Sequence, residues 1–112
     1  MRPDRERLKD ILDAVRNIQE KIPAAKDEFL HADLIQVWVL YHIQIIGEAA
    51  NGISPEFRSR HPDVPWKDII AMRHFLVHQY FGIDVEEVWN TAARDLPDLA
   101  GKIRGILEEK EP

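Results

Sequence analysis

The sequence predicts an all-α fold, an antiparallel bundle of four or five helices that forms a single domain over residues 1–112. Three observations support this fold class. Apolar residues recur at three- and four-residue spacing, helix-capping residues and prolines separate the apolar segments, and no four residues alternate between apolar and polar as in a strand. A chain of this length can also bury a core without disulfides or metals.

Two helices are expected in the first half of the chain. The first contains apolar residues at helical spacing from Leu8 to Ile22 and ends at Pro23. The second runs from about Phe29 to Asn51, is apolar on nearly every side, and is followed by Gly52 as a C-terminal stop. A helix that is apolar all round is either central to the bundle or covered by a second subunit.

Two further helices are expected in the middle of the chain. Ser54 followed by Pro55 has the pattern of an N-cap with proline at the first helical position, and so opens a short helix. Pro65 begins the next helix, which is expected to continue to about His78.

The last third of the chain is also expected to be helical. Asp84 stands where a capping residue precedes a helix, with Glu87 three residues later. Pro97 either kinks that helix or starts a final one that ends near Glu109.

Composition excludes several classes of protein. The chain has no cysteine, which removes disulfides, thiolate metal sites and cysteine nucleophiles and fits a cytoplasmic protein. Its charged N-terminus is unlike a signal peptide. The longest apolar stretch, residues 34–50, is interrupted by Gln36, His42, Gln44 and Glu48, so no membrane association is expected. Glu48 is interpreted as a buried partner of a cation.

The net charge of −5 argues against a nucleic-acid partner, but the charge is unevenly distributed. Residues 1–57 carry 7 basic and 10 acidic side chains, and residues 79–112 carry 4 and 8. Residues 58–78 carry 4 basic and 2 acidic side chains, together with three histidines. An otherwise acidic protein thus concentrates its positive charge in one segment, although a sample this small can do so by chance.

That segment contains an arginine in an unexpected place. On an ideal helix Lys67, His74 and His78 share one stripe, whereas Arg73 lies on the apolar side among Ile69 and its neighbours. A guanidinium there is costly unless it is paired or faces a cavity.

Three interpretations remain open at this point. Arg73 could form a salt bridge with a core acid such as Glu48, with the histidines merely solvated. His74 and His78 could bind a metal, although the glutamate of the zinc-protease motif is missing between them. Finally, arginine to bind phosphate and histidine to move protons could together cleave a phosphodiester without metal.

The segment also resembles a known family. Arg73, four residues, His78, one residue and Tyr80 match the Arg-x4-His-x-Tyr signature of HepT-like proteins of the HEPN superfamily. Further blocks of the same family follow in the same order: Ile45–Ala50, Pro62–Trp66, Ile69–Arg73, Val77–Asp84, Val88–Trp89 and Asp95–Pro97. The resemblance covers the chain from the second helix to its end. One position departs from it, because His74 stands where the family often has asparagine or aspartate.

The resemblance implies an all-helical homodimer with the two motifs at its interface, acting as a metal- and cofactor-independent endoribonuclease toxin. It also implies a cognate minimal nucleotidyltransferase antitoxin that silences the toxin by transferring AMP to the motif tyrosine, here Tyr80. Arg73 and His78 are then the expected catalytic residues, with His74 and Tyr80 in support. Arg58, Arg60 and Lys67 are the candidates for holding the RNA backbone.

Helix geometry constrains how Arg73 and His78 can act together. On an ideal helix Arg73 and His78 lie about 140° apart, so the helix loosens, Arg73 reaches across, or two subunits complete the site.

The alternative function is a non-catalytic helical module that binds the nucleotidyltransferase. Trp38, Trp66 and Trp89 are interpreted as core or dimer-interface aromatics.

Overall fold

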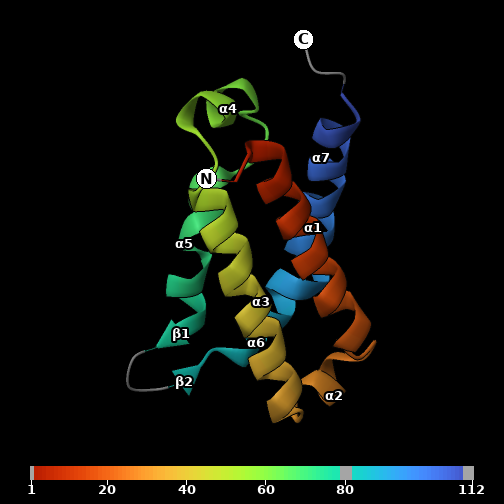
Figure 1. The fold of residues 1–112 in the computed structure, drawn as a ribbon. Coiled ribbons are helices and arrows are strands. Elements are labelled where there is room, and N and C mark those ends of the chain that lie inside the picture. The colour runs from red at the N-terminus through yellow and green to blue at the C-terminus, as the bar shows by residue number, and fades with distance from the viewer. Residues whose placement is uncertain (1, 79–81, 110–112) are drawn as a thin grey trace.

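Four long helices form the body of the protein in a computed structural model, which describes residues 2–78 and 82–109, with the backbone alone at residues 73, 75, 77 and 78. They are α1 (Asp4–Lys21), α3 (Asp33–Asn51), α5 (Trp66–Leu76) and α7 (Leu96–Glu108). Figure 1 shows that successive long helices run in opposite directions. Helix α3 contacts both α1 and α5, and α1 also contacts α7. The all-α fold class predicted from the sequence is confirmed.

Short elements connect the long helices. They are α2 (Lys26–Leu30), α4 (Pro55–Arg60), the two-residue strands β1 (Val77–His78) and β2 (Gly82–Ile83), α6 (Val85–Asn90) and a π-helical turn, η1 (Thr91–Asp95). The strands pair antiparallel, with Val77 opposite Ile83 and His78 opposite Gly82. Within the described part of the chain, this is the only sheet.

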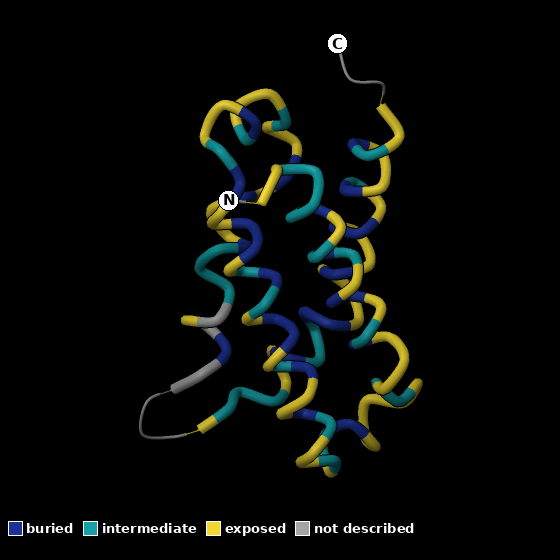
Figure 2. The backbone as a smooth tube through the Cα atoms, in the orientation of Figure 1, coloured by how far each residue is buried: buried dark blue, intermediate teal, exposed yellow. Residues whose placement is uncertain are grey.

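The core lies between the long helices, as the buried positions in Figure 2 show. Helix α1 contributes Leu8, Ile11 and Ile18, all fully buried. Phe29 of α2 is also fully buried, and its ring lies 5.5 Å from that of Trp89 on α6. This contact joins the start of the α2–α3 segment to the second half of the chain.

The second predicted helix is in fact two helices. The chain leaves helical geometry at His31 and Ala32, where φ is −111° and −113°, so α2 and α3 are separate. The buried side chain of Gln36 donates a hydrogen bond to the carbonyl oxygen of Phe29 at 2.9 Å. The same carbonyl accepts a hydrogen bond from the backbone N–H of Ala32 at 3.1 Å, so the Gln36 side chain adds a second bond at the end of α2.

Two predicted N-caps are confirmed. The hydroxyl of Ser54 accepts a hydrogen bond from the backbone N–H of Phe57 at 3.2 Å, and a carboxylate oxygen of Asp84 accepts one from Glu87 at 3.2 Å. Ser54 also bonds through its hydroxyl and its backbone N–H to Asp4, which ties the start of α4 to the start of α1. These caps satisfy backbone N–H groups that a helix cannot pair by itself.

Gly52 follows the last residue of α3 as expected, but its backbone conformation differs from the expected one. Its φ is −82°, which is ordinary right-handed geometry and not the left-handed conformation that favours glycine at a helix end. A Cβ at this position would collide with the guanidinium of Arg7 on α1. The glycine therefore makes room for a side chain from the neighbouring helix.

Pro97 stands in the first turn of α7, directly after η1. Proline donates no hydrogen bond, and its ring meets the carbonyl four residues earlier, here that of Ala93 inside the π turn. The wider π-helical turn thus lies where, in a regular α-helix, the proline ring would clash with this carbonyl. Of the two expectations for Pro97, the start of a final helix is the one observed.

A helix that crosses a bilayer needs about 20 predominantly apolar residues. Among the described residues, no helix is both long and apolar enough to cross a membrane.

Candidate active site

Helix α5 carries the first half of the predicted motif and lies close against α3. At Gly47 of α3, a Cβ would lie 3.4 Å from the carbonyl oxygen of Ile69 and 3.6 Å from that of Ile70. These are contact distances to backbone atoms, which leave little room for any side chain larger than a methyl group. A small residue at position 47 is thus compatible with the close approach of α3 and α5, and a larger side chain is not.

The two sides of α5 differ as the sequence predicts. Ile69 and Leu76 are buried, whereas Lys67 and His74 are exposed. At about 100° per residue, Arg73 lies near the angular positions of both Ile69 and Leu76. The backbone of Arg73 therefore lies on the apolar side of α5, as predicted. The side chain of Arg73 lies outside what the structure describes.

The expected helix through His78 is wrong at its end. Helix α5 stops at Leu76, and the next two residues form β1. The backbone N–H of Asp84 donates to the carbonyl oxygen of Leu76 at 2.9 Å, extending the contact between the two chain segments. Gly82 supports this geometry with a φ of +82°, which is a conformation that glycine adopts readily.

This ending changes the relation between the motif residues. Arg73 is on a helix and His78 is on a strand, so the 140° separation calculated for one continuous helix does not apply. For the same reason, His74 and His78 do not form a histidine pair on one helical face, which removes the geometric basis of the metal interpretation. Tyr80 lies outside the described residues.

A shallow depression of about 230 Å³ lies beside His74, between α3 and α5. It is lined by Gln44, Gly47, Glu48, Asn51, Ile70 and His74. Glu48 is exposed and accepts a hydrogen bond from the amide of Gln44 at 3.3 Å. The expectation that Glu48 is buried is therefore wrong, whereas a pairing of Arg73 with an acid is not tested, because the side chain of Arg73 lies outside what the structure describes.

The three candidate RNA-backbone residues lie toward the other end of α5. Arg58 and Arg60 belong to α4, which Figure 1 places beyond the N-terminal end of α5, and Lys67 is in the first turn of α5. Arg60 lies 5.4 Å from the centre of the Phe57 ring. Eleven helical residues span about 16 Å, so these cations do not cluster with His78. They could contact a nucleic acid only as part of an extended path.

The three tryptophans have different environments. Trp66 is buried in the core, and Trp89 packs on Phe29. Trp38 retains 38% of its exposure, and its indole N–H donates to the carbonyl oxygen of Asn17 at 3.0 Å.

Trp38 belongs to an exposed apolar stripe on α3 that the sequence alone did not identify. Its four members are Leu34, Val37, Trp38 and Tyr41, with 87%, 56%, 38% and 60% of their surfaces exposed. Their spacing places them on one face of α3. Figure 1 shows that this N-terminal half of α3 lies at the same end of the molecule as β1 and β2. We call these four residues the α3 stripe.

Comparison with known proteins defines the class to which this fold and motif belong. The family model described as "Ribonuclease HepT-like" matches residues 11–106. The chain therefore belongs to the HepT-like ribonuclease family, as the motif predicted.

Individual relatives agree with that family. A Thermococcus cleftensis protein named "Probable ribonuclease HepT" is 37% identical over 106 residues, covering 94% of this chain and 96% of its own. Proteins with RNase names from Caldanaerobacter subterraneus and Methanocaldococcus jannaschii are 30% and 35% identical, covering 99% and 86% of this chain and 100% and 89% of their own. No solved structure matches the chain.

Proposed function

We propose that this protein is a metal-independent endoribonuclease that acts as the toxin of a toxin–antitoxin pair. The observation that carries the proposal is the family match over residues 11–106, which includes the complete Arg73–His78–Tyr80 motif. Arginine supplies a permanent positive charge for phosphate, and histidine can exchange protons near neutral pH. A chemistry built on these two groups needs no metal.

The proposed reaction is an internal displacement at phosphorus. The ribose 2′-hydroxyl loses its proton and attacks the adjacent phosphate, while the 5′-oxygen leaves and gains a proton. The products are a 2′,3′-cyclic phosphate and a 5′-hydroxyl end. His78 serves as the base or the acid, and Arg73 stabilises the charge that grows on the phosphate oxygens.

Supporting roles fall to nearby residues. His74 is exposed on α5 and can donate a hydrogen bond to a phosphate, as can Tyr80. Lys67, Arg58 and Arg60 hold the RNA backbone further from the reacting bond.

The test is cleavage of RNA by purified protein in excess EDTA. We expect cleavage to persist under chelation, to give fragments with cyclic-phosphate ends, and to disappear when the nucleotide before the cut carries 2′-deoxyribose. A parallel preparation of the His78→Ala protein serves as the control for a contaminating nuclease. Loss of cleavage in EDTA, or an identical fragment pattern from both preparations, would contradict the mechanism.

We also propose that the working form is a homodimer formed through the α3 stripe. Contiguous exposed apolar side chains on one helix face are typical of an interaction surface. A twofold axis would bring the same stripe from each copy together, since a twofold interface is self-complementary. The stripe lies at the same end of the molecule as β1 and β2, so the proposed dimer would join the two copies at the end that carries His78.

Regulation by a minimal nucleotidyltransferase would act at Tyr80. Transfer of AMP to its hydroxyl would add a phosphate anion and a nucleoside within the motif, neutralising positive charge and occupying substrate space. We expect intact-mass spectrometry after co-expression with the partner to show AMP addition, and the Tyr80→Phe protein to show none. A mass increase that persists in Tyr80→Phe would assign the modification to another residue.

The non-catalytic module remains the alternative, and expression in cells distinguishes the two. A ribonuclease toxin inhibits growth, and the inhibition disappears in Arg73→Ala and His78→Ala. Harmless expression of the wild-type chain, together with retained binding of the nucleotidyltransferase, would favour the module.

A further inference from the structure

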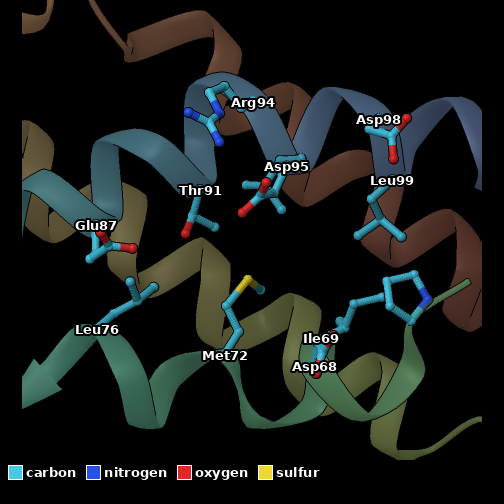
Figure 3. A pocket seen from close by; sticks show the side chains of 12 residues that line it. Asp68, Ile69, Met72, Leu76, Glu87, Thr91, Arg94, Asp95, Asp98 and Leu99 are labelled. Carbon is cyan, nitrogen blue, oxygen red and sulfur yellow. The ribbon is translucent and has the colours of Figure 1, made fainter.

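A second cavity, of about 600 Å³, lies on the side of α5 that faces the η1–α7 segment. It shares no lining residue with the depression beside His74. Its floor is apolar and includes Ile69, Met72, Leu76, Leu96 and Leu99. Figure 3 shows side chains from α5 and from the η1–α7 segment lining opposite sides of this space. A volume of this size is typical of pockets that bind small molecules.

Thr91 gives the cavity a polar group without a partner in the described part of the chain. Thr91 is only 6% exposed, and its hydroxyl makes no hydrogen bond within the described part of the chain. In Figure 3 the hydroxyl points into the cavity. The hydroxyl is open to the cavity and has no partner within the described part of the chain, so it is available to a ligand.

The backbone at Thr91 is also unusual. Thr91 begins the π-helical turn, which also supplies Arg94 and Asp95 to the lining. Short π segments inside α-helices are rare and are frequent at functional sites. The π-helical turn thus forms part of the same wall of the cavity as the Thr91 hydroxyl.

The rim of the cavity is predominantly negative. Four carboxylates, from Asp68, Glu87, Asp95 and Asp98, face one guanidinium, from Arg94. Asp98 is 3.5 Å from the ammonium of Lys102, and Glu87 accepts a hydrogen bond from Asn90 at 3.4 Å. Asp68 and Asp95 have no ion pair with any described residue. Two carboxylates at the rim are thus unpaired.

We propose that this cavity binds a linear aliphatic polyamine, a ligand in which ammonium groups are separated by short methylene chains. The ammonium groups complement the rim carboxylates and can donate a hydrogen bond to the Thr91 hydroxyl. The methylene segments cover the apolar floor between them. A bare metal ion would leave that floor exposed to water, and a neutral apolar ligand would leave the carboxylates without a partner.

Titration of the intact protein with spermidine at low salt tests the proposal. We expect saturable binding to one site per chain by calorimetry, and no binding of 1,8-octanediol, which has a similar aliphatic length without charge. Asp95→Asn should weaken spermidine about tenfold, because a hydrogen bond to a charged group is lost. Thr91→Val keeps the side-chain shape and should weaken it about fivefold, without lowering the unfolding temperature.

Glu20→Gln is the matched control, because it makes the same change in net charge at an exposed position of α1 outside the cavity. It should leave spermidine affinity unchanged. An equal loss in Glu20→Gln and Asp95→Asn would overturn the proposal, because it would show attraction to overall charge alone. Non-saturable binding, or an unchanged affinity in a folded Thr91→Val protein, would overturn it as well.

Discussion

Replacing His78 with alanine should reduce the rate of RNA cleavage by about 10²–10⁴-fold, the range typical of removing a general acid or base. The unfolding transition should change little, because the backbone of His78 lies in a two-residue strand and not in one of the long helices. Single-turnover cleavage assays and thermal unfolding of the same preparations measure the two quantities.

His31→Ala is the matched control for that experiment. His31 is exposed at the end of α2, where its Nδ1 lies 2.9 Å from the carbonyl oxygen of Asp27, far along the chain from the motif. Its removal should leave cleavage unchanged. A comparable loss of activity in both variants would mean that His78 has no specific chemical role.

Arg73→Ala separates the functional interpretation of Arg73 from a structural one. A catalytic arginine predicts lost activity with nearly unchanged stability, whereas a core ion pair predicts a destabilised fold. Arg104→Ala, at an exposed position of α7, removes the same charge elsewhere and controls for weaker attraction of RNA to the whole protein.

Local chemistry explains the parts of the fold that the sequence predicted well. Ser54 and Asp84 cap helices through hydrogen bonds to residues three positions later, so the information lies within a single turn. The helical periodicity of α1 likewise depends on close neighbours. Features of this kind are independent of the rest of the fold and can be inferred from short segments.

The predictions that were wrong concern positions where contacts with residues distant in the sequence determine the backbone conformation. No glycine or proline marks the break at His31, and the buried Gln36 that accommodates it is recognisable only once the helices are packed. The end of α5 depends on pairing with Gly82 and Ile83, beyond the helix itself. Gly52 supports the same conclusion, because its role depends on Arg7 from another helix.

The residues of the candidate site remain a prediction from the motif, whereas the surface around them became recognisable only in the fold. The apolar character of the segment 29–51 indicated either a central helix or a covered one, and α3 has features of both. It packs against α1 and α5 on one side and leaves the α3 stripe exposed on another. Periodicity alone cannot separate these faces, because apolar residues occupy both.

The homodimer proposed above, formed through the α3 stripe, can be tested by placing a charge on that surface. Tyr41→Asp should raise the dissociation constant of the homodimer by at least about 10²-fold, because twofold symmetry places each new carboxylate in the interface twice. Tyr41 is 60% exposed, so the isolated chain should stay folded. Light scattering coupled to size-exclusion chromatography measures the mass, and cleavage assays of the same fractions show whether the monomer is active.

Two control variants distinguish loss of the α3 contact from a general effect of added charge. Tyr41→Phe retains the apolar ring and should remain dimeric, whereas Gln19→Asp adds the same charge at an exposed position of α1 and should have no effect on assembly. If Tyr41→Asp remains a dimer, the copies meet through another face. If it becomes a folded monomer that cleaves RNA at the wild-type rate, one chain carries the whole site. If the folded Tyr41→Asp protein loses both dimerisation and RNA cleavage, pairing of the α3 helices is needed to complete the site. The motif residues of one chain would then cleave RNA only when those of the second chain lie beside them.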